Sequence, residues 1–220
     1  METTETLRAD VWVIGSGAAG LMAAIKAKLA GADVAVGGKS GPGKGTSTTF
    51  AVGAFAGPWG GMSEDDYKER VLTAGRGLNE TEMVDIAASE AGARFQDLID
   101  WGMTTKSAPG VFMALPKGDP GDRVPVWGRE IVHTLVAKAE EVGVRFVNNL
   151  VVRSIASGED GVCLSAYGAR QRQWFELRGG AVILAAGGAG ALFLHHDNPK
   201  RIGGDAHTLA YEAGCVMQDM

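Results

Sequence analysis

A glycine-rich turn near the N-terminus has the residue types and spacing of a nucleotide-binding loop. The sequence Gly15-Ser16-Gly17-Ala18-Ala19-Gly20 follows an apolar run over residues 11–14 and opens an alanine-rich stretch over 21–29, which predicts a strand, a tight turn and a helix. In such a turn the first glycine permits the bend, the second lets a diphosphate approach the backbone, and the third lets the helix pack against the strand. The helix N-terminus then faces the phosphates with its unpaired N–H groups.

The elements around this turn help to distinguish a nucleotide-binding turn from a purely structural one. A second predicted strand over 33–36 follows the helix across Gly31, so a βαβ unit surrounds the motif. A glycine turn that serves close packing alone is the alternative. The βαβ context favours a dinucleotide.

Composition excludes several classes of protein. The 220 residues carry 21 basic and 26 acidic side chains, for a net charge of -5, and no basic cluster suggests a nucleic-acid partner. Cys163 and Cys215 have no metal-type spacing and the N-terminus lacks an export signal, so we expect a cytoplasmic protein without a disulfide framework. The uncharged stretches over 45–63 and 179–194 are rich in small residues, and we expect no membrane span.

Helical periodicity recurs in the middle of the chain. Ser63 with Asp66, and Asn79 with Glu82, have the spacing of capping boxes and predict two helix starts. A further helix is predicted over 128–142. The proline- and glycine-rich segment 102–126 between them is predicted to lack regular structure and to serve a site.

Strand patterns complete the predicted fold. A strand is expected over 144–147, and loosely alternating runs over 151–155, 162–167 and 173–177 are typical of an antiparallel meander. The continuous apolar run over 181–185 is typical of a buried parallel strand. We predict an α/β fold: a Rossmann-like parallel sheet with helices on both faces and an inserted antiparallel β-meander.

The order of these pieces resembles the FAD-binding domain of the fumarate reductase and succinate dehydrogenase flavoprotein family, which also includes L-aspartate oxidase. Beside the first turn, the pieces that carry the resemblance are the stretch 45–53, Gly128-Arg129-Glu130, the strand and turn over 182–190, Asn198-Pro199 and the stretch 203–207. The resemblance covers nearly the whole chain, and it implies FAD as the cofactor.

The resemblance also implies which residues contact FAD. Hydroxyls and N–H groups over 45–53 can lie against phosphate and the flavin edge, with Ser47 and Thr48 as the best candidates; a flexible Gly/Ser/Thr linker is the alternative. Val152 matches a position that holds the adenine through its backbone. The full set is Gly15, Ser16, Gly17, Ala18, Ala19, Gly20, Gly38, Lys39, Ser40, Gly45, Thr46, Ser47, Thr48, Thr49, Ala51, Gly53, Val152, Ala185, Ala186, Gly187, Gly188 and Asp205.

Three positions depart from the family pattern. Ala186 stands where threonine is usual and lacks its hydroxyl. Ala206 replaces the second glycine after Asp205, and Asp205 as the N-cap of a helix over 206–213 is an alternative or additional role. Gly37-Gly38-Lys39 occupies the place, about 20 positions after the glycines, where an acidic residue normally binds the ribose, so an NADP-binding module stays open.

Other absences limit the chemistry. Residues 46–54 contain no histidine of the kind that attaches flavin covalently in the family, so we expect noncovalent FAD. His195, His196, Asp197 and His207 fix no coordination geometry, and we expect no metal. Arg123 and Arg129 have the planar fork that meets a carboxylate, with surface salt bridges as the alternative.

The resemblance implies an FAD-dependent oxidoreductase that exchanges a hydride with a small dicarboxylate, and it further implies an electron-transfer partner subunit. Residues 1–220 match one FAD-binding domain that is incomplete relative to the family, whose capping domain and catalytic residues lie beyond the matching region. No catalytic residue is therefore assigned. An L-aspartate oxidase-like enzyme, and a truncated or non-catalytic FAD- or NAD(P)-binding module, are the alternatives.

Overall fold

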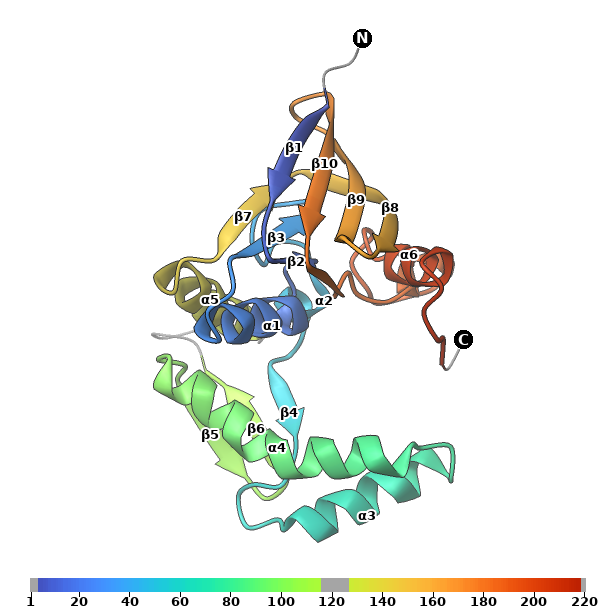
Figure 1. Ribbon diagram of the computed structural model, residues 1–220. Helices are drawn as coiled ribbons and strands as arrows, with labels where there is room; N and C mark the ends of the chain where they lie inside the picture. Colours follow the sequence, from blue (N-terminus) through green and yellow to red (C-terminus); the bar gives the residue numbers. More distant parts are fainter. Residues whose placement is uncertain (1–3, 116–126, 219–220) are drawn as a thin grey trace. The chain divides into compact units, whose positions relative to one another are not determined.

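A computed structural model describes residues 4–115 and 127–218. The chain divides into two compact units, one formed by Met1–Phe50 with Leu135–Met220 and the other by Ala51–Thr134. We call the first the nucleotide unit and the second the insert unit, and Figure 1 labels helices and strands of both. The assignment of 1–220 to a single FAD-binding domain stays a prediction.

The nucleotide unit is built on a four-stranded parallel sheet in the order β11-β2-β3-β7. Its strands are β2 (Val11–Ile14), β3 (Val34–Gly38), β7 (Arg145–Asn148) and β11 (Ala181–Leu184). Helix α1 (Ala18–Leu29) follows β2 and contacts β2, β3 and β11. The predicted βαβ unit is confirmed. The apolar run over 181–185 forms a parallel strand as predicted, but the prediction that it is buried is wrong, because β11 lies at the edge of the sheet and none of its residues is buried.

The same unit contains a second sheet of strands β1, β10, β9 and β8 in that order. Strands β8 (Leu150–Gly158), β9 (Gly161–Gly168) and β10 (Gln173–Gly179) form the predicted antiparallel meander. Strand β1 (Glu5–Arg8), which the sequence analysis missed, pairs parallel to β10. In Figure 1 β1 lies beside β10.

The two sheets share one apolar core. Trp12 and Ile14 of β2 lie in one cluster of buried side chains with Leu164, Phe175 and Leu177 of the meander. The indole Nε1 of Trp12 also donates to the carbonyl of Arg178 at 3.0 Å. Helices were expected on both faces of the parallel sheet, but the antiparallel sheet packs on the face opposite α1, because the alternate side chains of β2 point into the meander.

Three short elements and one long helix complete the nucleotide unit. Helix α2 (Ser47–Phe50), the 3₁₀ turn η1 (Gly190–Leu192) and helix α6 (Asp205–Glu212) lie in its loops. Helix α5 (Gly128–Glu141) contains the boundary between the two units. Its bounds agree with the predicted 128–142.

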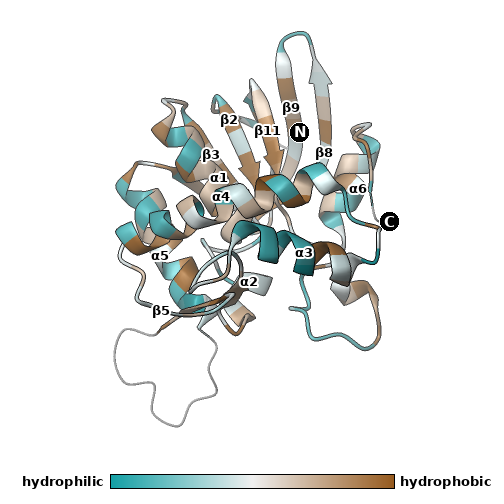
Figure 2. Ribbon diagram, turned by 90° about the horizontal axis from the view of Figure 1, so that it is seen from below, coloured by the Kyte–Doolittle hydropathy of each residue, from teal (hydrophilic) through white to brown (hydrophobic). Residues whose placement is uncertain are grey.

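The insert unit contains a small antiparallel sheet and two helices. Strands β4 (Ala54–Ala56), β6 (Val111–Ala114) and β5 (Thr105–Ala108) pair in that order. The two helices are α3 (Glu64–Gly75) and α4 (Thr81–Asp100). The rings of Phe55, Trp59 and Phe112 each contact another ring of this unit, with Phe95 among the partners. Figure 2 shows α3 as mostly hydrophilic, in agreement with its lack of buried residues.

The prediction that 102–126 lacks regular structure is wrong for its first half. Val111–Ala114 pairs with both neighbouring strands, and the proline and glycine residues at 109–110 form the turn between β5 and β6. Within the described part of this segment, the proline and glycine residues interrupt the strands only at this turn. Residues 116–126 lie outside the described part of the chain.

One of the two predicted capping boxes forms. The Ser63 hydroxyl accepts the Asp66 N–H at 3.1 Å, and the Asp66 carboxylate accepts the Ser63 N–H at 3.4 Å. The capping box at Asn79 and Glu82 is wrong, because α4 is capped at Glu80 without a side-chain bond. The Asn79 side chain packs against Gly75 instead, where an added Cβ would meet its Oδ1 at 1.6 Å.

None of the described helices is both long and apolar enough to cross a membrane.

Gly20→Ala tests the close packing of α1 on β2. The added Cβ would lie 2.0 Å from the Gly15 carbonyl oxygen, so the free energy of unfolding is expected to fall by about 1–3 kcal/mol. Gly92→Ala is the matched control, since Gly92 also lies within a helix but has no atom within 4 Å, and alanine there should add about 0.5–1 kcal/mol. Urea unfolding followed by circular dichroism measures both; shifts of the same sign would contradict the packing argument.

Candidate functional site

The turn between β2 and α1 is held by two backbone approaches that admit no side chain. Gly15 has φ +113°, and a Cβ there would meet the Ala185 carbonyl oxygen at 2.2 Å. Gly20 approaches the Gly15 carbonyl from the first turns of α1. Gly17 differs from both, because the nearest atom to its Cβ would be the Thr48 Oγ1 at an ordinary 3.7 Å. Two motif glycines therefore serve packing, and the third leaves space at the helix N-terminus.

The N-terminus of α1 carries little that competes with an anion. Its N-cap is Gly17, which makes no side-chain cap bond, and its first turn contains no acidic residue. The Ala18 N–H donates to the Thr48 hydroxyl oxygen at 3.2 Å. Lys26 and Lys28 lie in the last turn, where positive charge complements the helix dipole.

The loop over 41–49 is held beside this turn by hydroxyl groups. The buried Ser16 Oγ accepts the Gly43 N–H at 3.1 Å. Thr46 and Thr49 pair through their Oγ1 atoms at 2.9 Å, and the Thr49 hydroxyl also donates to the Gly43 carbonyl. The linker alternative is therefore at odds with the structure, because the loop is tied by its own Ser and Thr side chains.

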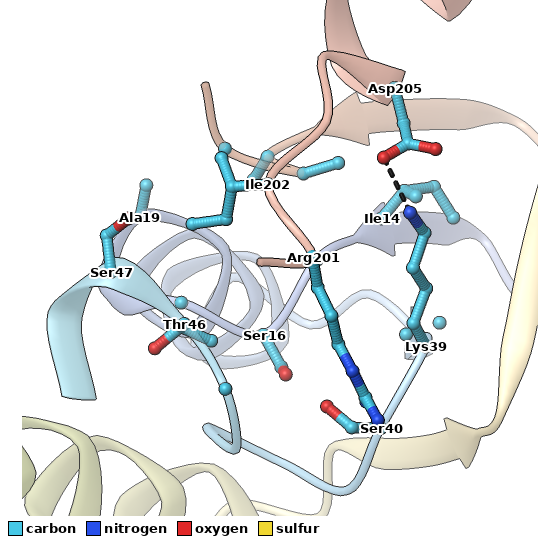
Figure 3. A pocket seen from close by; sticks show the side chains of 18 of the residues that line it. Ile14, Ser16, Ala19, Lys39, Ser40, Thr46, Ser47, Arg201, Ile202 and Asp205 are labelled. Atoms are coloured by element: carbon cyan, nitrogen blue, oxygen red, sulfur yellow. Dashed lines mark hydrogen bonds and ion pairs between the residues drawn. The ribbon is translucent and has the colours of Figure 1, made fainter. Parts of the chain in front are cut away.

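These segments line one cavity at the carboxyl ends of the parallel strands, where ligands bind in open α/β sheets. Pairing of Ile14 with Gly37 and Leu184 brings the three strand ends level. Figure 3 shows side chains around the cavity. Its lining residues are Ile14, Gly15, Ser16, Gly17, Ala18, Ala19, Gly37, Gly38, Lys39, Ser40, Lys44, Gly45, Thr46, Ser47, Thr48, Leu150, Val152, Ala185, Ala186, Gly187, Arg201, Ile202, Asp205 and Leu209.

Five predicted contact residues lie outside this lining. Gly20 is buried under the turn, and the Thr49 hydroxyl bonds within its own loop. The Gly188 carbonyl accepts the Gly204 N–H at 3.2 Å. Ala51 and Gly53 belong to the insert unit, where a Cβ on Gly53 would meet the Trp127 carbonyl carbon at 2.8 Å. Their roles as FAD contacts stay predictions.

The lining also contains residues that the sequence analysis missed. Leu150 is two positions before Val152 on β8, so strand periodicity was a signal that both face the same side. Lys44 lies in a segment already singled out, between Ser40 and Gly45. Arg201, Ile202 and Leu209 had no such signal, because only the chain's path after η1 brings them to the cavity.

An ion pair joins two predicted contact residues across the cavity. The Lys39 Nζ lies 2.6 Å from the Asp205 Oδ2, although 166 positions separate them in the sequence (Figure 3). The predicted N-cap role of Asp205 is wrong: Gly204 is the N-cap of α6, and the carboxylate reaches Lys39 instead. Both side chains are more than a third exposed, so this ion pair adds little to the free energy of unfolding and mainly fixes the positions of the two side chains beside the cavity.

Other candidate groups lie apart from this cavity. No group of three His, Cys, Asp or Glu side chains within 4–115 and 127–218 is placed to hold a metal. Arg129 is exposed in α5 and does not line the cavity, and Arg123 lies outside the described residues. Burial raises the pKa of the Cys163 thiol, and its hydrogen bond to Glu176 raises it further, so this thiol stays protonated.

Comparison with known proteins identifies the family of the chain that contains this glycine turn. A family model described as the FAD binding domain matches residues 10–220. The chain belongs to this family. L-aspartate oxidase of Streptomyces coelicolor is 31% identical over 97% of this chain, and a subunit of the fumarate reductase (CoM/CoB) of Methanothermobacter marburgensis is 27% identical over 99%. The family is one of FAD-dependent oxidoreductases, and the predicted cofactor, FAD, is confirmed at this level.

Solved structures agree with this assignment. Sdh1 of Mycobacterium smegmatis superposes with a TM-score of 0.79 at 27% identity, over 94% of this chain and 38% of its own. FrdA of the E. coli quinol fumarate reductase has the same fold, with a TM-score of 0.81 at 24% identity over 94% of this chain and 37% of its own. The chain spans 39% of the S. coelicolor enzyme and 42% of the M. marburgensis protein.

Ser16→Ala tests the tie between the glycine turn and the loop over 41–49. The Gly43 N–H would lose its acceptor in a buried place, at a cost of about 1–3 kcal/mol. Hydrogen exchange over residues 41–46 is expected to become faster by about fivefold or more, since 1.4 kcal/mol corresponds to a factor of about 10. Ser47→Ala serves as the control, because the Ser47 hydroxyl makes only an exposed 3.4 Å bond to Asn198. Unchanged exchange in Ser16→Ala would refute the role of this bond.

Proposed function

We propose that the cavity at the carboxyl ends of β2, β3 and β11 binds FAD, with the N-terminus of α1 facing the diphosphate. The observation that carries this proposal is the pair of close approaches at Gly15 and Gly20, which leave space at Gly17, beside the cavity and at the N-terminus of α1, whose first turn contains no acidic residue. The N–H groups of a helix N-terminus and the helix dipole favour a negatively charged group at that place.

The side chains present fit a dinucleotide. Glycine, alanine, serine and threonine dominate the lining around α1, so a diphosphate can approach the backbone closely. Lys39, Lys44 and Arg201 add positive charge, and the one acidic residue in the lining, Asp205, pairs with Lys39. The cavity holds about 210 Å³, which is below the roughly 300 Å³ of pockets that enclose whole ligands, so the described residues provide a cradle for part of FAD.

We infer noncovalent attachment, because residues 46–54 contain no histidine. The chain's own residues then hold the cofactor through three elements: the α1 N-terminus at the diphosphate, the backbone around Val152 beside the adenine, and the 185–187 turn beside the nucleotide. When bound, FAD supplies a hydride acceptor or donor. No side chain of the described residues is assigned to move a proton.

The proposed reaction of the whole protein is hydride exchange with a small dicarboxylate, of the fumarate reductase, succinate dehydrogenase or L-aspartate oxidase type. The names of the relatives support it, since they specify the oxidation of L-aspartate and the reduction of fumarate. An electron-transfer partner subunit is part of the proposal, because the M. marburgensis relative is itself one subunit of its enzyme by name.

The proposed location is the cytoplasm. The two cysteines of this chain, Cys163 and Cys215, are both free, which supports this location.

Gly17→Ala tests the cradle. Its Cβ fits the fold but enters the space beside the helix N-terminus, so the dissociation constant for FAD is expected to rise by about tenfold or more, or 1.4 kcal/mol. Gly158→Ala also adds a methyl in open space, at the end of β8 and outside the lining, and should bind FAD as the unaltered chain does. Flavin fluorescence during titration measures both. Equal affinities in the two variants would place FAD elsewhere.

The attachment and the reaction have separate readouts. Acid precipitation of the yellow protein is expected to release all flavin into the supernatant; colour in the pellet would contradict noncovalent binding. FAD reduced on the protein under anaerobic conditions is expected to be reoxidised by fumarate. A non-catalytic module is supported if the protein binds FAD, fumarate does not reoxidise the reduced FAD, and neither L-aspartate nor succinate reduces the oxidised FAD. Protein that refuses FAD and accepts NADPH overturns the assignment of the cavity.

A further inference from the structure

A second, open cavity of about 570 Å³ adjoins the proposed FAD cradle in the nucleotide unit. Its lining includes Lys39, Lys44, Arg170 and Arg201, and the described residues around it include no carboxylate. Asn148 and Asn149 contribute neutral amides. We call it the basic cavity.

Positive charge gathers here from separate parts of the chain. Lys39 and Lys44 follow β3, Arg170 lies in the turn between β9 and β10, and Arg201 precedes α6. Lys39 is neutralised by Asp205. Lys44, Arg170 and Arg201 make no side-chain ion pair within residues 4–115 and 127–218.

The cluster contrasts with the net charge of -5 of the whole chain, and its three unpaired cations, Lys44, Arg170 and Arg201, are exposed and so accessible to a ligand. Like charges that face one cavity repel one another, and the repulsion is relieved when an anion enters. The composition of the basic cavity therefore indicates an anionic ligand.

The backbone that carries these cations is held in place by hydrogen bonds. The Ala169 N–H donates to the Asn149 carbonyl at 2.9 Å, and the Arg172 N–H donates to the Gly168 carbonyl at 2.7 Å, which fixes the turn on both sides of Arg170. The Ser40 hydroxyl donates to the Lys44 carbonyl at 2.6 Å. Fixed backbone lowers the entropy lost when the long side chains close on a ligand.

We propose that the basic cavity binds a phosphate or diphosphate group. Guanidinium groups bind phosphate oxygens in bidentate pairs, and a doubly or triply charged anion matches three unpaired cations better than a single carboxylate does. Lys39, Ser40, Lys44, Gly45 and Arg201 line both cavities, so the bound group lies against the proposed nucleotide site. Its two sources are a free inorganic anion and a phosphate on the ribose of an adenine nucleotide.

Inorganic diphosphate is the first probe, titrated calorimetrically into the FAD-saturated chain. The unaltered protein is expected to bind it with a dissociation constant below about 1 mM at low salt, and more weakly as salt screens the cations. Arg170→Gln is expected to weaken binding about fivefold or more, since Arg170 lines the basic cavity but not the FAD cradle. Arg172→Gln removes the same charge two residues away, outside the lining, and should change affinity less than about twofold.

Three results would overturn the proposal: no heat with diphosphate, equal weakening in Arg170→Gln and Arg172→Gln, or succinate bound as tightly as diphosphate. The source of the anion is decided on protein without FAD. Adenosine 2′,5′-bisphosphate bound at least tenfold tighter than 5′-AMP, with the difference lost in Arg170→Gln, supports a ribose phosphate; equal affinity together with diphosphate binding supports a free anion. Flavin absorbance reports FAD binding independently, because Arg170 does not line the FAD cradle.

Discussion

The close approach of three backbone segments underlies the candidate site. Gly15 lies against the Ala185 carbonyl, and Gly20 lies against the Gly15 carbonyl, so β2, the start of α1 and the turn after β11 come together without intervening side chains. This contact sets where the α1 N-terminus points and brings the ends of β2 and β11 level. The loop over 41–49 and the residues near α6 are positioned around it.

The second constraint is the core shared by the two sheets. Trp12 and Ile14 face the meander and bury against Leu164 and Leu177, which places β8 on the same side as the cavity. Leu150 and Val152 reach the cavity for this reason. An antiparallel sheet thus performs the covering role that helices have on both faces of other doubly wound folds, and it also contributes lining residues.

The sequence was sufficient for the local elements and for the glycine turn. Apolar runs and their spacing predicted β2, α1 and the three meander strands, because these signals are local. Ser16 and Thr48 were identified by residue type, but their bonds to Gly43 and Ala18 depend on how the 41–49 loop folds back. Arg201 and the Lys39–Asp205 pair were beyond sequence reasoning, since contacts across 166 positions are set by tertiary packing. The capping box predicted at Asn79 was wrong for a local reason, because the Asn79 side chain packs on Gly75, four positions earlier.

Strand β1 also protects the molecule against self-association. It pairs with β10 from Glu5 to Arg8 and so occupies the hydrogen-bonding edge of the antiparallel sheet. An unpaired edge is a template to which a strand of another molecule adds, and it promotes aggregation. Strand β1 is itself the outer strand of this sheet, but it is only four residues long and carries charge at Glu5 and Arg8, so it offers a poor template to a strand of another molecule.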